Sequence, residues 1–351
     1  MFRIINFVYF LVLTLLTSCG VGYYLHLFKG QLKVVTSTTD VTTFRGATKD
    51  STILRKLVIV DSLLVFANEI GLNTRNNYQS YFDTQGEPIS WNVSASQPDT
   101  FKSYLWEFPF VGSIPYKGFF DKKRAQSEYS RLKKLNYDVY MAPISAYSTL
   151  GYFSDPLLST MLSLEIGNLT ELLLHELTHS TVYLSGMTDF NESFASFVGR
   201  KGAEQFLEQQ FGSRSEYFQN LVQSRVDLQR FRLFMEGVVD RLDSLYSTES
   251  NVQEVMLKRK FIFDKEKMLF SKSLHNYKNQ NYKNFLNWDL NNARLLSYKR
   301  YNSAMPNFQA VYENNDESIE KLISLAITCS RMKEPYDCIQ KTFNLDISKT
   351  P

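Results

Sequence analysis

The segment from Leu172 to Ala195 reads LLLHELTHSTVYLSGMTDFNESFA and contains the pattern HExxH. Residues four apart on an α-helix share one face, so His175 and His179 can direct their imidazoles at a single cation. Neutral imidazole nitrogens suit Zn²⁺. Glu176, next to the first histidine, can act as a general base on a water at the metal without binding the metal itself. The segment therefore predicts a helix that carries a zinc site.

A third metal ligand is predicted at Glu192. We expect the first helix to run to Leu184 and to end where Gly186 takes a left-handed conformation. Asp189 or Asn191 can then cap a second helix, which puts Glu192 in its first turn, facing the histidines. Two histidines and a glutamate leave a fourth position for water, as catalytic zinc sites require. The alternative is that Glu192 only complements the dipole at the start of the second helix.

The HExxH pattern by itself is moderately specific, because it occurs by chance in about one per cent of chains of this size. The chain has four histidines in all, and two of them stand at this spacing. An extended HExxHxxGxxH site is excluded, since Val182 and Ser185 occupy the positions that need glycine and histidine. Hydrogen-bond partners of the histidines are expected, and Asn191, Glu165 and Asp189 are the candidates.

The N-terminal residues differ in composition from the rest of the chain. Arg3 precedes an apolar run from Phe7 to Leu16, which as a helix spans about 15 Å, too short to cross a membrane. The run ends in Leu16-Thr17-Ser18-Cys19, which resembles a bacterial lipobox. We therefore predict a lipoprotein signal peptide over residues 1–18 and lipidation of Cys19. An ordinary secretory signal or a buried apolar segment are the alternatives.

Lipidation implies a bacterial cell envelope location, anchored to a membrane. Gly20 is not the aspartate that often retains lipoproteins at the inner membrane, so the outer membrane is preferred. The segment from Gly20 to Val35 is aromatic and apolar, and can pack on the body or lie near the membrane. Cys329 and Cys338 remain as an even pair, which can form a disulfide in an oxidising compartment or stay as free thiols.

The remaining chain indicates a single domain over residues 19–351, of the α+β class and predominantly helical. Two long helical patterns with a turn between them predict an antiparallel hairpin over about 214–285. Other predicted elements are helices at 51–70, 121–135 and 316–332, a strand at 138–144, strands and turns over 104–120, loop or short edge strands over 73–100, and hairpin helices at 214–246 and 252–285. A net charge of +3, without basic runs interleaved with aromatic residues, argues against nucleic-acid binding.

These motifs resemble a bacterial family described as putative aminopeptidases, zinc-motif lipoproteins related by motif to the gluzincin peptidases. The resemblance runs over most of the mature chain, through Gly22–Tyr24, Gly30-Gln31, Gly112–Asp121, Ala146–Pro156, His175–His179, Phe190–Ala195 and Asn291–Arg294. It implies a gluzincin-like core with a small sheet, in which His175, His179 and Glu192 hold zinc and Glu176 is the base. The family favours Gln and Trp where this chain has Ser180 and Tyr152, and neither position is a metal ligand.

The expected activity is zinc-dependent hydrolysis of a peptide substrate. Tyr147 and Tyr152 are candidates for the donor that stabilises the tetrahedral oxyanion, although either can be an ordinary packed tyrosine. The strand over 138–144 can offer an edge along which an extended peptide lies. A rival interpretation is a non-catalytic surface lipoprotein with a structural zinc site, which binds a partner through its helical hairpin.

The choice between aminopeptidase and endopeptidase stays open at this point. An aminopeptidase needs an acidic group to hold the free α-amine of its substrate. Asp155, Asp189 and Glu107 are the candidates for that group, and the sequence does not choose among them.

Overall fold

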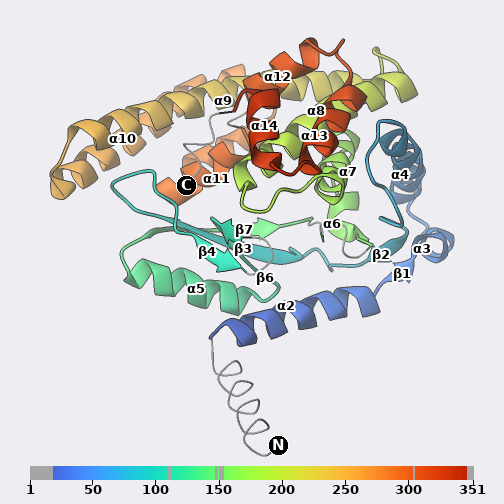
Figure 1. The fold of residues 1–351 in the computed structure, drawn as a ribbon, viewed down its shortest axis with the longest axis horizontal. Coiled ribbons are helices and arrows are strands. Elements are labelled where there is room, and N and C mark those ends of the chain that lie inside the picture. The colour runs from blue at the N-terminus through green and yellow to red at the C-terminus, as the bar shows by residue number, and fades with distance from the viewer. Residues whose placement is uncertain (1–18, 109–111, 147–148, 150–153, 303–304, 346–351) are drawn as a thin grey trace, which may run out of the picture.

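The computed structural model describes residues 19–108, 112–146, 149, 154–302 and 305–345. The predicted signal peptide, Tyr147 and Tyr152 lie outside these residues. Within them the protein is mainly helical, with small sheets gathered toward one side of the molecule (Figure 1). The predicted α+β class with predominant helix is therefore confirmed.

The main sheet has the strand order β6-β3-β7. β3 (Ser90–Ser96) pairs antiparallel with β6 (Lys117–Phe119) and, along its whole length, with β7 (Asp138–Ile144). The bounds predicted for β7 are confirmed. β3 corrects the expectation of loop or edge structure over 73–100, because it is the central strand. Its composition is polar, but Val93 and Ala95 are buried in a hydrophobic cluster with Leu132 of the neighbouring helix.

Two smaller sheets complete the strands of the described residues. One has the order β1-β2-β8 and the other pairs β4 with β5. Their bounds are β1 Thr39–Asp40, β2 Ser80–Phe82, β8 Leu157–Leu158, β4 Trp106–Phe108 and β5 Gly112–Ile114.

Two helices lie along one side of the main sheet, below it in Figure 1: α2 (Cys19–Thr36) and α5 (Lys122–Lys134). Asp121 caps α5 as predicted, since its carboxylate accepts a hydrogen bond from the Arg124 amide at 2.8 Å. The Tyr23 hydroxyl donates to the Gly118 carbonyl at 2.9 Å, which ties α2 to β6. No helix in the described part of the chain is both long and apolar enough to cross a membrane.

The largest hydrophobic cluster surrounds the helix pair α7 (Ile166–Thr181) and α8 (Thr188–Phe211). Three further helices line this part of the molecule: α3 (Val41–Ala47), α4 (Ser51–Glu69) and α6 (Ser159–Leu162). α7 and α8 approach closely at Gly199, where an added Cβ would lie 2.7 Å from the Glu171 carbonyl oxygen. The absence of a side chain at this position therefore lets the two backbones touch.

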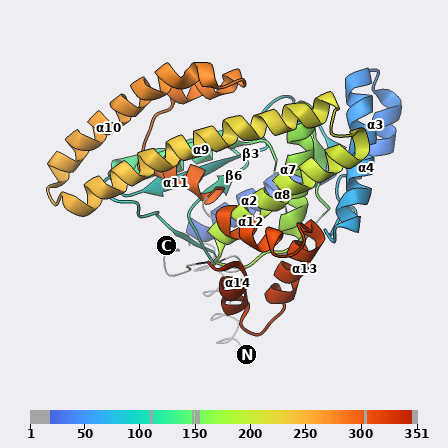
Figure 2. The same ribbon diagram turned by 90° about the horizontal axis from the view of Figure 1, so that it is seen from above.

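The predicted hairpin consists of α9 (Glu216–Thr248) and α10 (Val252–Ser273), which diverge from their turn (Figure 2). The helix expected over 252–285 is too long by twelve residues. After Ser273 the chain forms short 3₁₀ helices, η1 (Leu274–Asn276) and η2 (Gln280–Asn287). Asp227 of α9 accepts hydrogen bonds from the amides of Lys278 and Asn279 at 2.9 and 2.8 Å, which turns the chain back. Phe285 is thereby buried against Phe231 and Phe270.

The C-terminal part contains α11 (Asn292–Arg300), α12 (Met305–Glu313), α13 (Ile319–Ser330) and α14 (Pro335–Phe343). α13 lies within the helix predicted over 316–332. Cys329 and Cys338 form a disulfide between α13 and α14, with Cα atoms 5.3 Å apart.

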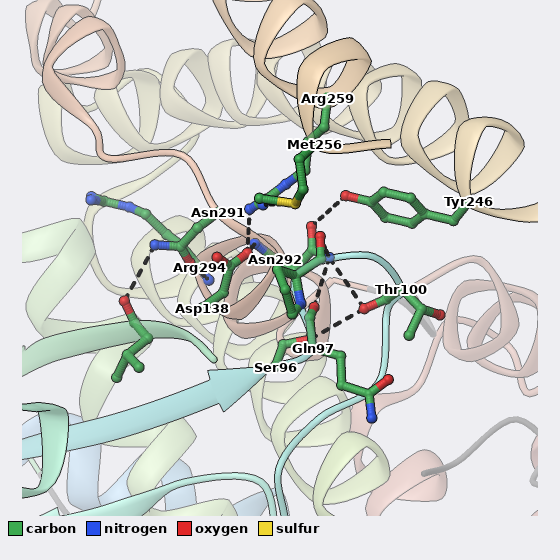
Figure 3. A network of polar contacts seen from close by, with 12 residues as sticks. Ser96, Gln97, Thr100, Asp138, Tyr246, Met256, Arg259, Asn291, Asn292 and Arg294 are labelled. Atoms are coloured by element: carbon green, nitrogen blue, oxygen red, sulfur yellow. Dashed lines mark hydrogen bonds and ion pairs between the residues drawn. The ribbon is translucent and has the colours of Figure 1, made fainter. Parts of the chain in front are cut away.

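A buried polar network ties the hairpin to the main sheet (Figure 3). Asp138, at the start of β7, forms an ion pair with Arg259 of α10 and accepts a hydrogen bond from the Asn292 amide at 2.8 Å. The Asn292 side chain donates to the carbonyls of Gln97 and Thr100 and accepts from the Tyr246 hydroxyl at 2.8 Å. Because Asn292 bonds through its amide and its side chain to protein groups of this network, the segment Asn291–Arg294 that carries part of the family resemblance has a structural role.

Candidate metal centre

His175 and His179 of α7 face Glu192 of α8 across the close helix contact. The two Nε2 atoms are 3.1 Å apart, and each lies 3.6 Å from Glu192 Oε2. Ligands at 2.0–2.1 Å from a tetrahedral zinc ion lie about 3.3 Å from one another. The three atoms therefore fit three corners of such a site, and the three residues could hold a metal.

The loop between the two helices differs from the expectation. α7 ends at Thr181 instead of Leu184, and Gly186, with φ +77°, lies in the loop. Neither Asp189 nor Asn191 caps α8, because the N-cap residue is Met187. The Asn191 side chain instead accepts from the Leu184 amide at 3.0 Å and donates to the Leu184 carbonyl at 2.8 Å.

These two hydrogen bonds between Asn191 and Leu184 close the loop before α8. α8 begins at Thr188, so Glu192 is the fifth residue of this helix. Glu192 thus lies in the second turn of the helix instead of the predicted first turn. A glutamate that only complements the helix dipole would lie in the first turn of the helix. The position of Glu192 therefore weakens the alternative that it has only this role.

None of the three predicted partners orients the histidines. Asp189 pairs with Arg300 at 3.7 Å, and Glu165 stands at the N-cap of α7 without a side-chain cap hydrogen bond. The nearest partner is Ser196, one turn beyond Glu192, whose Oγ is 3.5 Å from His175 Nδ1. Among the described residues, His179 Nδ1 has no hydrogen-bond partner.

The two glutamates at the site have opposite electrostatic surroundings. Burial raises the pKa of Glu176, although the neighbouring histidines offset part of this effect. Burial would also raise the pKa of Glu192, but His179 and His175 outweigh it and hold that pKa well below its usual range. Glu192 is therefore a stable anion suited to ligating a cation, while Glu176 binds a proton more readily.

Two tyrosines that the sequence did not single out stand beside the metal residues. The Tyr116 hydroxyl lies 3.5 Å from Glu192 Oε1, and the Tyr301 ring centroid is 6.2 Å from that of His175. The charge of Glu192 and burial raise the pKa of Tyr301, and burial and Glu192 raise that of Tyr116. Both phenols therefore stay protonated and can donate hydrogen bonds. No local pattern signals either residue, since each reaches the site from a distant segment.

A cavity of 750 Å³ opens over the metal residues. Its described lining includes the end of β7 and a charged cluster of Glu171, Arg200 and Arg225, in which Arg225 Nη1 is 2.7 Å from Glu171 Oε2. Glu171 lies one helical turn before His175, on the same face of α7.

The residues predicted to hold a substrate amine do not lie in the described lining of this cavity. Asp155 is buried and accepts a hydrogen bond from the Thr149 amide at 3.0 Å. Glu107 accepts from the Ser113 hydroxyl at 2.6 Å, and Asp189 pairs with Arg300. Apart from Glu176 and Glu192, the acidic residue in the described lining of the cavity is Glu171.

Comparison with known proteins gives one family. A family model described as "Putative aminopeptidase" matches residues 22–335, which include all of α7 and α8. No curated protein and no solved structure matches the chain.

Proposed function

The chain belongs to the putative aminopeptidase family, and from this membership and the metal centre we propose that it is a zinc-dependent peptidase with a gluzincin-like core. The observation that carries the proposal is the set of three donor atoms at 3.1–3.6 Å, beside a glutamate that is not part of the set. Catalytic zinc sites combine three protein ligands with an open position. Structural zinc sites usually have four protein ligands, and the described residues supply three at this place.

In this proposal Glu176 carries the proton transfers. A zinc ion held by His175, His179 and Glu192 would polarise the scissile carbonyl and lower the pKa of a water. Glu176 takes the proton of the attacking water and passes it to the leaving amine. Its raised pKa suits a group that holds a proton between these two steps.

Hydrogen-bond donors for the oxyanion come from Tyr301 and Tyr116. Both line the cavity beside the metal residues, and a protonated phenol aimed at developing negative charge stabilises the transition state. Tyr147 and Tyr152 stay as proposals from the sequence, outside the described residues.

The substrate is proposed to be a peptide lying beside β7. This strand stands at the end of the order β6-β3-β7, and Pro143 and Ile144 line the cavity. An extended chain can add to such an edge through backbone hydrogen bonds. Glu171 is the acidic group proposed to bind a free α-amine of the substrate. It would bind this amine while also paired with Arg225.

We further propose that Cys19 is lipidated and anchors the protein to a bacterial envelope membrane, the outer membrane being preferred. The lipobox supports this assignment. α2 begins at Cys19 itself, so an acyl anchor would lead directly into the folded body.

The Glu176→Gln variant tests the activity. We expect hydrolysis of a peptide library to fall by about 10²–10⁴-fold, because the general base is lost while its shape remains. Zinc content and melting temperature should match the wild type. In the same assay the Tyr301→Phe variant should hydrolyse peptides about 10²-fold more slowly if the Tyr301 hydroxyl donates a hydrogen bond to the oxyanion.

Full hydrolysis by Glu176→Gln would contradict the proposed mechanism. If neither protein hydrolyses any peptide while zinc is bound, the rival function is favoured: a lipoprotein with a structural zinc site that binds a partner through its α9–α10 hairpin. Peptides with acetylated N-termini separate the two peptidase classes, because an aminopeptidase cleaves only those with a free amine.

A further inference from the structure

One face of α2 is apolar and exposed. Tyr24, Leu25, Phe28, Leu32 and Val35 all point away from the body, and Phe28 is 64% exposed. On a helix these positions fall within one stripe about 100° wide. The opposite face packs on the sheet side of the molecule, where Val34 is buried and the Phe120 amide donates to His26 Nε2 at 3.1 Å.

Basic residues border this stripe. Lys29 and Lys33 lie along one side of it, and the sequence of α2 contains no acidic residue. α5 adds six exposed basic residues against one acidic residue: Lys122, Lys123, Arg124, Arg131, Lys133 and Lys134, with Glu128. The two helices are joined where Arg124 Nη1 donates to the Gly22 carbonyl at 3.4 Å.

This surface, hereafter the α2–α5 face, lies on the opposite side of the main sheet from α7 and α8 (Figure 1). The whole chain has a net charge of only +3, so the basic residues of the α2–α5 face are a local excess. A surface that is apolar, basic and remote from the cavity can bind a partner without blocking the metal centre.

We propose that the α2–α5 face lies on an anionic lipid bilayer, with α2 in the plane of the membrane surface. The stripe enters the boundary between headgroups and acyl chains, and the lysines and arginines remain among the phosphates. The choice of partner rests on the proposed lipidation of Cys19, because an acyl chain at the first residue of α2 would hold this helix against the bilayer.

Charge argues against a second copy of the chain as the occupant. Two α2–α5 faces brought together would oppose eight basic residues with eight, and each face offers two acidic residues in return, Glu128 and Asp121. An anionic membrane complements the same charges. Bound in this way, the protein would keep α7 and α8 on the side of the sheet away from the lipid.

The test uses residues 19–351 carrying Cys19→Ser, so that binding does not depend on an acyl chain. The described hydrophobic clusters involve no residue before Tyr23, so this chain keeps its core. Flotation with phosphatidylcholine vesicles containing one third phosphatidylglycerol should show binding that weakens with salt. Pure phosphatidylcholine vesicles should bind less protein.

A double variant, Phe28→Ser with Leu32→Ser, should lower binding to the anionic vesicles by about tenfold, since binding scales with the apolar area inserted. Leu257→Ser with Phe261→Ser is the matched control. These side chains are 66% and 69% exposed on α10, and their loss should leave vesicle binding unchanged.

Equal binding by the Cys19→Ser parent protein and the α2 double variant, or no binding of the parent protein to anionic vesicles, would overturn the inference. So would a dimer in solution that the α2 variant abolishes, because a second copy would then cover the face. Zinc content and peptide hydrolysis are measured on the same samples, so a failed membrane interaction is distinguished from a failed metal centre.

Discussion

The helix pairs α7–α8 and α9–α10 use opposite kinds of packing. α7 and α8 touch backbone to backbone at Gly199 and bury polar side chains, including Thr178, Asn191 and Glu192. α9 and α10 diverge from their turn (Figure 2), and aromatic rings around Phe231 and Phe270 pack between them and η2.

The α7–α8 pair therefore positions the metal-binding atoms, whereas the α9–α10 pair contributes stability. Donor atoms must be held to within a fraction of an ångström to bind a metal, and close backbone contact provides that restraint. A cluster of large rings contributes stability through buried area and does not need to present any polar atom. We therefore expect damage to the aromatic cluster of α9–α10 to lower stability without changing the metal site, and damage to the α7–α8 contact to change the metal site as well.

The largest effect should come from Phe270→Ala, which tests the supporting role of the hairpin. Phe270 is fully buried, so its loss should lower the free energy of unfolding by about 3–5 kcal/mol. Urea unfolding measures this change. Zinc content of the folded protein should stay at the wild-type value, because the metal residues lie on α7 and α8, which contribute no residue to this cluster.

Phe261→Ala is the control for this experiment. Phe261 lies on the same helix but is exposed, so its removal should change stability by no more than about 0.5 kcal/mol. If folded Phe270→Ala protein lost its zinc, the separation of the two helix pairs would be wrong.

A smaller effect on stability is expected for Gly199→Ala, with a larger effect on the metal. The added Cβ would lie 2.7 Å from the Glu171 carbonyl and 3.3 Å from the His175 Cβ, so α8 must shift against α7. Overpacking of this kind costs about 1–3 kcal/mol. Zinc affinity, measured by competition with a chelator, should fall because the donors move apart.

Gly46→Ala in α3 is the matched control, since a Cβ added there would have nothing within 4 Å of it. It should leave zinc affinity unchanged. Wild-type zinc affinity in Gly199→Ala would show that the close approach of the helices does not position the ligands.

The sequence predicted those features that depend on neighbours along the chain. The i, i+4 spacing of His175 and His179 brings them together on any helix, and the Asp121 cap and the strand over 138–144 follow equally local rules. The distance of Glu192 from His179 leaves room for one tight turn, which is enough to predict that Glu192 lies on the second helix.

Features set by distant contacts could not be predicted in this way. α10 ends early because Asp227, far back in α9, holds the chain after it. Tyr116, Tyr301 and Glu171 reach the cavity only through the folded arrangement, since no spacing marks them. Asn191 likewise does not cap α8 as predicted, because its side chain forms hydrogen bonds with the backbone of Leu184 across the loop.

Metal stoichiometry by mass spectrometry, on freshly prepared protein spanning residues 19–351, tests the metal centre most directly. We predict about one zinc ion per wild-type chain, lost in His179→Ala and kept in His275→Ala, whose histidine lies in η1 outside the site. Folded wild-type protein that binds no zinc, even after zinc is added back, would contradict it.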